Sequence, residues 1–158
     1  MSDTYAVTAV GHVAGGRAEV RDDDWGAETA TIRLDRQQFE AEAVAGLDAF
    51  SHLEVVYLFD RVDPAGVERG ARHPRGNTAW PRVGIFAQRA KDRPNRIGVG
   101  VCRLLAVEGR DVRVAGLDAV DGTPVLDIKP VMAEFLPRGE VRQPGWSREL
   151  MRGYWRSS

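Results

Sequence analysis

Four cationic side chains crowd into eight residues near the middle of the chain. They are Arg89, Lys91, Arg93 and Arg96. All four lie in GIFAQRAKDRPNRIG (84–98), a segment between two apolar runs in which glycine and proline favour a turn. Because like charges repel, such a cluster is normally exposed, paired with acids or neutralised by an anionic ligand. Arginine offers paired donors to a carboxylate or phosphate and a flat face that stacks on a base. The segment therefore predicts binding of an anionic or planar ligand.

A second polar segment, LDAVDGTPVLDIKP (117–130), supplies carboxylates and one more cation. These are Asp118, Asp121, Asp127 and Lys129. The acids either neutralise the cationic cluster and form turns, or share a binding site with it. If a general base is needed, Asp121 and His73 are the candidates, and the sequence does not choose between them. His73 qualifies because an imidazole on a long loop can meet a ligand.

Other chemistries find little support. The GVG at 98–100 stands inside a strand pattern with no helix after it, which excludes a dinucleotide fingerprint, and neither a P-loop nor a GxSxG elbow is present. The three histidines lack metal-ligand spacing, and the lone Cys102 has no second cysteine for a disulfide or a zinc cluster. We expect no metal, and structural roles for Cys102, His12 and His52.

Charge is distributed unevenly along the sequence. Residues 1–66 carry five arginines against thirteen acids, residues 67–96 carry eight cations against two acids, and the whole chain has a net charge of -1. A general affinity for polyanions is thereby excluded, although the middle third has local positive potential. Alternatively, the acidic and basic thirds pair with each other.

Length and composition are ordinary for a soluble globular protein. The 158 residues suggest one domain, with 43% hydrophobic and 28% charged residues. No apolar run approaches the roughly 20 residues that cross a bilayer, and the N-terminus lacks the basic region of a secretory signal. We expect a cytoplasmic protein with no membrane partner.

The elements that position the polar segments are mostly strands. Alternating and β-branched patterns predict strands at 4–13, 29–34, 51–60, 82–88, 97–109, 112–120 and 123–131. EGRD (108–111) is typical of a tight hairpin turn. The proline- and glycine-rich stretch 63–81 is a long surface loop, which in a compact domain is usually functional or disordered.

Two segments favour helix. Asp35 is expected to cap a helix over 36–47, and the near-helical spacing of apolar residues in 144–158 predicts a helical tail. The predicted fold is mainly β: a single compact antiparallel β-barrel with one or two short helices. We expect the barrel domain to span residues 1–137 and the tail to span 138–158.

The motifs SHLEVVYLF, HPRGN, GIFAQRAKDRPNRIG and LDAVDGTPVLDIKP resemble, in order and spacing, those of the TsaA-like (TrmO) family. The resemblance covers roughly residues 46–131. It implies a compact β-barrel that binds S-adenosylmethionine and works as a homodimer, with the cofactor near the subunit interface. It also implies N6-methylation of threonylcarbamoyladenosine beside the anticodon of tRNA.

The same resemblance assigns roles to residues of this chain. For the cofactor it implies Asp60, Arg61, Arg89 and the backbone of Leu117, Asp118, Ala119 and Val120. For the acceptor it implies Arg75, Arg93, Asp127 and Lys129, with Asp121 or His73 as the base if one is used.

This sequence departs from the family pattern at three places, one of which is the divergent loop before HPRGN. Arg96 stands where the family turn RPNPIG has its second proline, and GHVAGGRAEVRDDDW (11–25) replaces the Arg-Ser-Pro stretch that helps bind the cofactor in relatives. Longer tRNA-modifying members also continue into a C-terminal domain. The alternatives are therefore a methyltransferase of this fold acting on a small molecule or peptide, and a non-catalytic module that binds S-adenosylmethionine or RNA.

Overall fold

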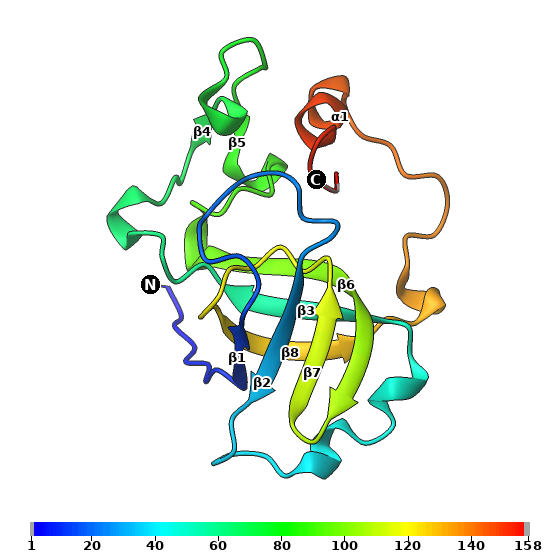
Figure 1. Cartoon of the computed structure of the whole chain (residues 1–158). Coiled ribbons are helices and arrows are strands. Elements are labelled where there is room, and N and C mark those ends of the chain that lie inside the picture. Colours follow the sequence, from blue (N-terminus) through cyan, green and yellow to red (C-terminus); the bar gives the residue numbers. More distant parts are fainter. Residues whose placement is uncertain (1, 157–158) are drawn as a thin grey trace.

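Six antiparallel strands close into a barrel in the computed structural model, which describes residues 2–156 (Figure 1). Around the barrel the order is β1 (Gly11–Ala14), β2 (Thr29–Leu34), β7 (Asp111–Ala115), β6 (Ile97–Glu108), β3 (His52–Leu58) and β8 (Pro124–Pro130). The predicted mainly β, antiparallel barrel is confirmed. Closure leaves the barrel without an unpaired edge strand.

Alternation along the strands fills the barrel. In β3 the residues Leu53, Val55 and Tyr57 are buried, while their neighbours in the strand are partly exposed. Branched aliphatic residues dominate the interior and include Val13, Ile32, Val112, Val114 and Val125. Inward residues at every second position are what a strand with one buried face requires.

A small second sheet and one helix lie beyond one end of the barrel (Figure 1). Strands β4 (Ala71–Arg72) and β5 (Val83–Gly84) pair with each other, and helix α1 spans Gly145–Met151. The Trp80 indole donates to Glu149 Oε2 at 2.8 Å, which ties the β4–β5 loop to the helix. Helix α1 falls in the expected 138–158 tail, whose last two residues, like Met1, lie outside the described part.

Several predicted strands are shorter than expected. The first strand covers Gly11–Ala14 rather than 4–13. Residues 2–10 have no ladder partner in the described part of the chain, because β2 ends at the facing Leu34 and β8 pairs with β1 only at Val125 and Pro124. Strand β5 keeps only two residues before a 3-10 turn at Ile85–Ala87. The predicted 112–120 strand ends at Ala115, because Gly116 has φ +80° and turns the chain away.

The predicted helix over 36–47 is wrong. The segment forms two 3-10 turns at Ala41–Val44 and Leu47–Ala49, separated by Gly46 with φ +83°. Asp35 caps a turn rather than a helix, since its Oδ1 accepts from the Gln37 amide at 2.9 Å. The apolar spacing that favoured a helix reflects packing of irregular chain against the core, in which Val44 is buried. The two-residue hairpin between β6 and β7 is as predicted.

Candidate functional site

The loop after β7 combines buried side chains with backbone N–H groups that lack partners. Leu117, Ala119 and Val120 are each at most 9% exposed, so their side chains pack into the core. No hydrogen bond within residues 2–156 uses the backbone N–H of any residue from 117 to 120. Four successive donors therefore have no partner among the described residues. This is the loop that the resemblance assigns to adenosine binding.

Asp118 is the polar centre of that loop. Its Oδ1 accepts the Tyr57 hydroxyl at 2.8 Å, and its Oδ2 accepts the Tyr154 hydroxyl. Burial, then the Asp118 charge, raises the pKa of both phenols above the usual value. Both hydroxyls thus stay protonated and hold the carboxylate in place. A Cβ at Gly100 would lie 2.7 Å from Asp118 Oδ1, so strand β6 also needs a glycine beside it.

The arginines of the 84–98 segment bond to carbonyl groups rather than to acids. Arg89 Nη2 donates to Val99 O at 2.8 Å, and Arg93 Nη1 donates to Gln88 O at 2.6 Å. Neither has a carboxylate within 4.0 Å among the described residues. Arg89 is exposed, and its partner Val99 directly precedes Gly100, whose backbone lies against the Asp118 carboxylate. An unneutralised arginine beside unpaired amides suits an anionic ligand.

Arg96 has an unusual backbone. Both Asn95 and Arg96 have positive φ, +64° and +51°, and Arg96 Nη1 donates to Val62 O at 2.9 Å. Proline fixes φ near about −65°, so it cannot adopt the Arg96 conformation. The replacement of proline at this position therefore comes with a different turn.

Arg61 and Asp121 join the loop before β2 to the loop after β7. Arg61 donates to Ala18 O at 2.7 Å and to Asp121 O at 3.0 Å, while Asp121 Oδ1 accepts from the Gly15 amide at 2.9 Å. Both predicted residues thus border the loop 117–120. Asp60, also predicted for the cofactor, is exposed at the end of β3.

The two predicted residues of the β4–β5 loop have protein partners. His73 Nδ1 donates to Trp80 O at 2.7 Å, which leaves Nε2 for other contacts. Arg75 pairs with Asp23 at 3.1 Å and Asp22 at 3.7 Å. Here the basic segment does pair with the acidic one, as the alternative interpretation of the charge pattern predicts.

Asp127 and Lys129 lie away from this cluster, on the outer face of the barrel. They pair in register with Val56 and Glu54 of β3, and directly opposed residues share a face of the sheet. Because Leu53, Val55 and Tyr57 point inward, the other set points outward. Lys129 Nζ lies 2.7 Å from Asp127 Oδ2. The structure does not bring these two residues together with Arg89, and their predicted role stays a prediction.

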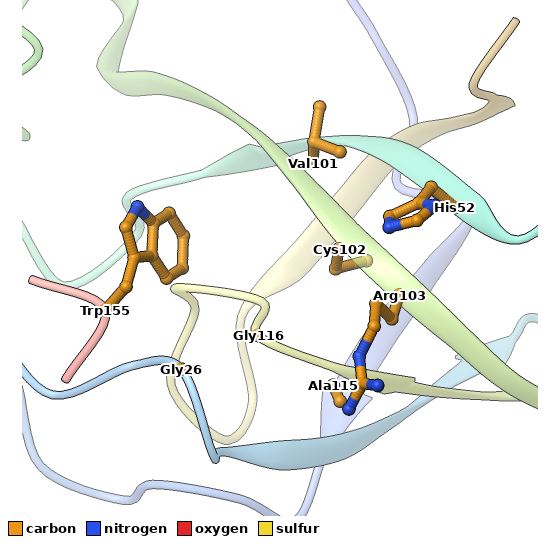
Figure 2. Close-up of a pocket in the computed structure, with 8 residues that line it drawn as sticks. All are labelled: Gly26, His52, Val101, Cys102, Arg103, Ala115, Gly116 and Trp155. Atoms are coloured by element: carbon orange, nitrogen blue, oxygen red, sulfur yellow. The ribbon is translucent and has the colours of Figure 1, made fainter. Parts of the chain in front are cut away.

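A hollow of about 200 Å³ opens at the barrel end between β6, β7 and the C-terminal segment. Figure 2 shows Trp155 at one end, His52 and Arg103 at the other, and Cys102 between them. Burial, with a smaller effect of the Asp118 charge, raises the pKa of the Cys102 thiol to about 12. The thiol is therefore protonated at neutral pH and fits the structural role expected for it.

Within residues 2–156, no group of three or more His, Cys, Asp or Glu side chains is arranged to hold a metal ion. Nor does any helix in this range have the length and apolar character to cross a membrane.

The sequence of this barrel matches a known protein family. A model described as the tRNA-methyltransferase O N-terminal domain matches residues 22–135. The chain belongs to this family.

Curated proteins are similar to this chain over 62% to 73% of its length. The human tRNA (adenine(37)-N6)-methyltransferase is 34% identical over 117 residues, which are 73% of this chain and 26% of that protein. The Escherichia coli K12 protein of the same name is 43% identical over 105 residues, 62% of this chain and 44% of its own length. A probable S-adenosyl-L-methionine-binding protein of Pyrococcus abyssi is 38% identical over 107 residues, 67% of this chain and 54% of its own. The chain thus spans from about a quarter to about half of these relatives.

Solved TrmO structures share the fold. One crystal structure of TrmO from Pseudomonas aeruginosa has a TM-score of 0.70 at 31% identity and covers 89% of this chain and 61% of its own. Another TrmO structure has a TM-score of 0.74 at 28% identity, over 92% of this chain and 63% of its own.

Two tyrosines were missed by sequence reasoning about this TrmO-family chain. Tyr57 is an inward position of β3, and a hydroxyl that faces the core must find a partner; that signal was present in the sequence. Tyr154 lies outside the matched residues 22–135. Nothing in the sequence indicates that it meets Asp118, 36 positions away.

Proposed function

We propose that the protein is an S-adenosylmethionine-dependent methyltransferase that acts on N6 of threonylcarbamoyladenosine beside the tRNA anticodon. Membership of the TrmO family supports the reaction type, and the names of the human and E. coli relatives specify a tRNA adenine at N6. The single observation that carries the proposal is the row of four unpaired amides at 117–120 beside Arg89.

These residues fit S-adenosylmethionine. Its adenine and ribose present acceptors to backbone N–H groups, and its carboxylate suits an arginine that no acid neutralises. Arg89, Arg61 and the loop 117–120 would hold the cofactor, with the buried Leu117 and Ala119 fixing the backbone in place. Asp118 would form part of the wall, since two tyrosines already fix its carboxylate.

The chemistry supplied by the bound cofactor is transfer of a methyl group from a positive sulfonium, which leaves as a neutral thioether. The N6 nitrogen forms the new bond to carbon and gives up a proton. Positioning supplies most of the rate of such an in-line reaction. His73 Nε2 is one acceptor for that proton, because Nδ1 already donates to Trp80 O. The second carboxylate oxygen of Asp121 is the other, because Oδ1 accepts from Gly15.

We also propose a cytoplasmic homodimer. The outer face of β6 supports the dimer, because Ile97, Val99 and Val101 are 40%, 39% and 47% exposed in a row. Rows of exposed apolar side chains mark interaction surfaces. Asp127 and Lys129 share the outer barrel face, so we propose that they contact the acceptor across the subunit interface.

The proposal is tested with the purified protein and S-adenosylmethionine in a calorimeter, followed by labelled cofactor and tRNA from a strain that lacks the enzyme. Saturable cofactor binding and label on one tRNA nucleoside are expected. Binding without transfer to any cell extract would favour the non-catalytic module. Label on a small molecule or peptide would favour the other alternative. A salt titration separates these acceptors, because several phosphate contacts give a steep salt dependence and a small acceptor does not.

A further inference from the structure

The C-terminal segment returns to the barrel end and bonds to the loop before β2. The Asp24 amide donates to Gly153 O at 3.1 Å, and the Trp25 amide donates to Tyr154 O at 2.8 Å. We call residues 152–156 the strap. It lies outside the family match at 22–135.

The loop that receives the strap is built around Arg17. This arginine is 9% exposed, donates to Asp23 O and Asp24 O at 2.9 and 2.7 Å, and lies 3.9 Å over the Trp25 ring. Buried charge-assisted bonds of this kind fix a loop in one conformation. The acidic stretch that replaces the family's Arg-Ser-Pro segment therefore forms an ordered dock for the strap.

Gly26 makes the fit close. A Cβ at this position would overlap the Trp155 carbonyl oxygen, which is backbone and cannot move without the strap. Gly26 has no positive φ, so alanine is excluded only by this contact. The strap thus lies directly on the loop before β2.

Tyr154 is the strap residue that enters the candidate site. Its hydroxyl donates to Asp118 Oδ2, and the charges of Arg89 and Arg75 act on its ring. Tyr57 holds the other carboxylate oxygen at 2.8 Å. Asp118 is consequently fixed from both sides, by the barrel and by the strap.

We infer that the strap is a wall of the cofactor site and that Tyr154 is a positioning residue, which orients Asp118 beside the amides of the loop 117–120. This inference rests on the proposed cofactor site. Within the candidate site the strap bonds to the Asp118 carboxylate, and it bonds neither to the Arg89 guanidinium nor to the four amides of 117–120. A segment that blocked the site, which we call a plug, would instead bond to those donors. The contacts therefore favour a strap that lines the cofactor site over one that occupies it.

The test uses Gly26→Ala, which displaces the strap without changing Tyr154, and Tyr154→Phe, which removes only the hydroxyl. Gly66→Ala is the matched control, because a Cβ there meets nothing within 4 Å. Affinity for S-adenosylmethionine is measured by calorimetry, with the melting temperature of each variant and the hydrogen exchange of the Trp25 amide. A Gly26→Ala protein that does not fold leaves Tyr154→Phe to decide.

Both variants are expected to bind the cofactor about tenfold more weakly than wild type, the effect of one lost bond to a charged group. Gly66→Ala should bind as wild type does, and the Trp25 amide should exchange more slowly when cofactor is bound. Unchanged affinity in Gly26→Ala and Tyr154→Phe would overturn the inference, and tighter binding would identify the strap as a plug. If wild type itself does not bind the cofactor, the proposed function fails before the strap is tested.

A double variant shows whether Tyr154 acts through Asp118. If it does, Asp118→Asn with Tyr154→Phe binds no more than twofold weaker than Asp118→Asn alone, because the second change has nothing left to orient. Independent losses that multiply would contradict a positioning role. A merely structural role would lower the melting temperature of both proteins without this coupling in affinity.

Discussion

The Tyr57 hydroxyl, at an inward position of β3, donates to Asp118 Oδ1 at 2.8 Å across 61 positions of sequence. The bond joins the strand of one family motif to the loop of another. The Tyr57 side chain is 2% exposed and Asp118 is partly buried, so water reaches this bond poorly. A partly buried carboxylate that loses such a donor is left with incomplete hydrogen bonding.

Tyr57→Phe is therefore expected to lower the free energy of unfolding by about 1–3 kcal/mol while keeping the ring packing. Urea unfolding followed by far-UV circular dichroism measures the change. Tyr5→Phe is the control, since Tyr5 is 82% exposed and should leave stability unchanged. Equal stability of the wild type and Tyr57→Phe would show that the bond contributes nothing.

Stability should fall steeply in alkali. Burial, then the Asp118 charge, raises the pKa of Tyr57 above the ordinary tyrosine value of 10.0. Above pH of about 10 the unfolded state therefore releases a proton that the folded state retains, and the free energy of unfolding falls as pH rises. The slope for Tyr57 approaches about 1.4 kcal/mol per pH unit.

Urea unfolding at several pH values from neutral into alkali measures that slope, and Tyr57→Phe should reduce it. A slope that is the same in wild type and Tyr57→Phe would show that this phenol titrates alike in both states. Since burial is the first cause for Tyr154 as well, Tyr154→Phe is expected to act in the same direction.

Strand periodicity predicted the barrel but not its boundaries. The segment LEVVY is mostly apolar and β-branched, and β3 buries its every second residue, Leu53, Val55 and Tyr57. By contrast, 36–47 has helical apolar spacing and forms 3-10 turns, because Gly46 adopts φ +83° and the segment only bridges β2 and β3. A local pattern predicts which residues are buried, whereas the tertiary context determines the secondary structure of the segment that carries them.

The sequence predicts those parts of the candidate site that lie within one continuous motif. Arg89 and the loop 117–120 come from segments that the sequence singles out, and Arg89 bonds to Val99 beside Gly100, which lies against Asp118. The partners Tyr57 and Tyr154 could not be paired with Asp118 from spacing, because they meet only once the barrel closes and the strap returns. Asp127 and Lys129 belong to the same motif as Asp118, yet they lie on strand β8 and face the outside of the barrel.

Arg89→Ala should weaken binding of S-adenosylmethionine by about 1–3 kcal/mol, the range for a bond to a charged group. Arg82→Ala is the matched control, because it removes an exposed arginine of the same basic segment. Calorimetry on both variants gives the comparison. Unchanged affinity in Arg89→Ala would remove Arg89 from the cofactor site.

Arg96→Pro, although it restores the family sequence, is expected to destabilise this protein by about 3 kcal/mol or more. Proline cannot adopt φ +51°, lacks the N–H that donates to Arg93 O at 2.9 Å, and loses the bond to Val62 O. Glycine adopts a positive φ without strain, so Arg96→Gly should lower the free energy of unfolding by only about 1 kcal/mol, for the lost side-chain bond. Thermal melting ranks the two, and a proline variant as stable as the glycine variant would contradict the strained turn.

Val99→Glu should dissociate the proposed homodimer. A charge in the middle of the exposed apolar row on β6 would have to be buried without a partner when two copies associate. Light scattering coupled to size exclusion measures the mass, with Val141→Glu as a control at another exposed valine. A monomeric wild-type protein would refute the dimer itself, and an intact Val99→Glu dimer would refute this interface.

The chain is proposed to transfer a methyl group to a modified tRNA adenine. The most direct measurement is mass spectrometry of nucleosides from tRNA of a strain that lacks the enzyme, after incubation with the purified protein and S-adenosylmethionine. We predict that the threonylcarbamoyladenosine peak moves to the mass of its N6-methyl derivative and that Arg89→Ala slows this conversion. An unchanged nucleoside profile from a protein that binds the cofactor would contradict the tRNA assignment.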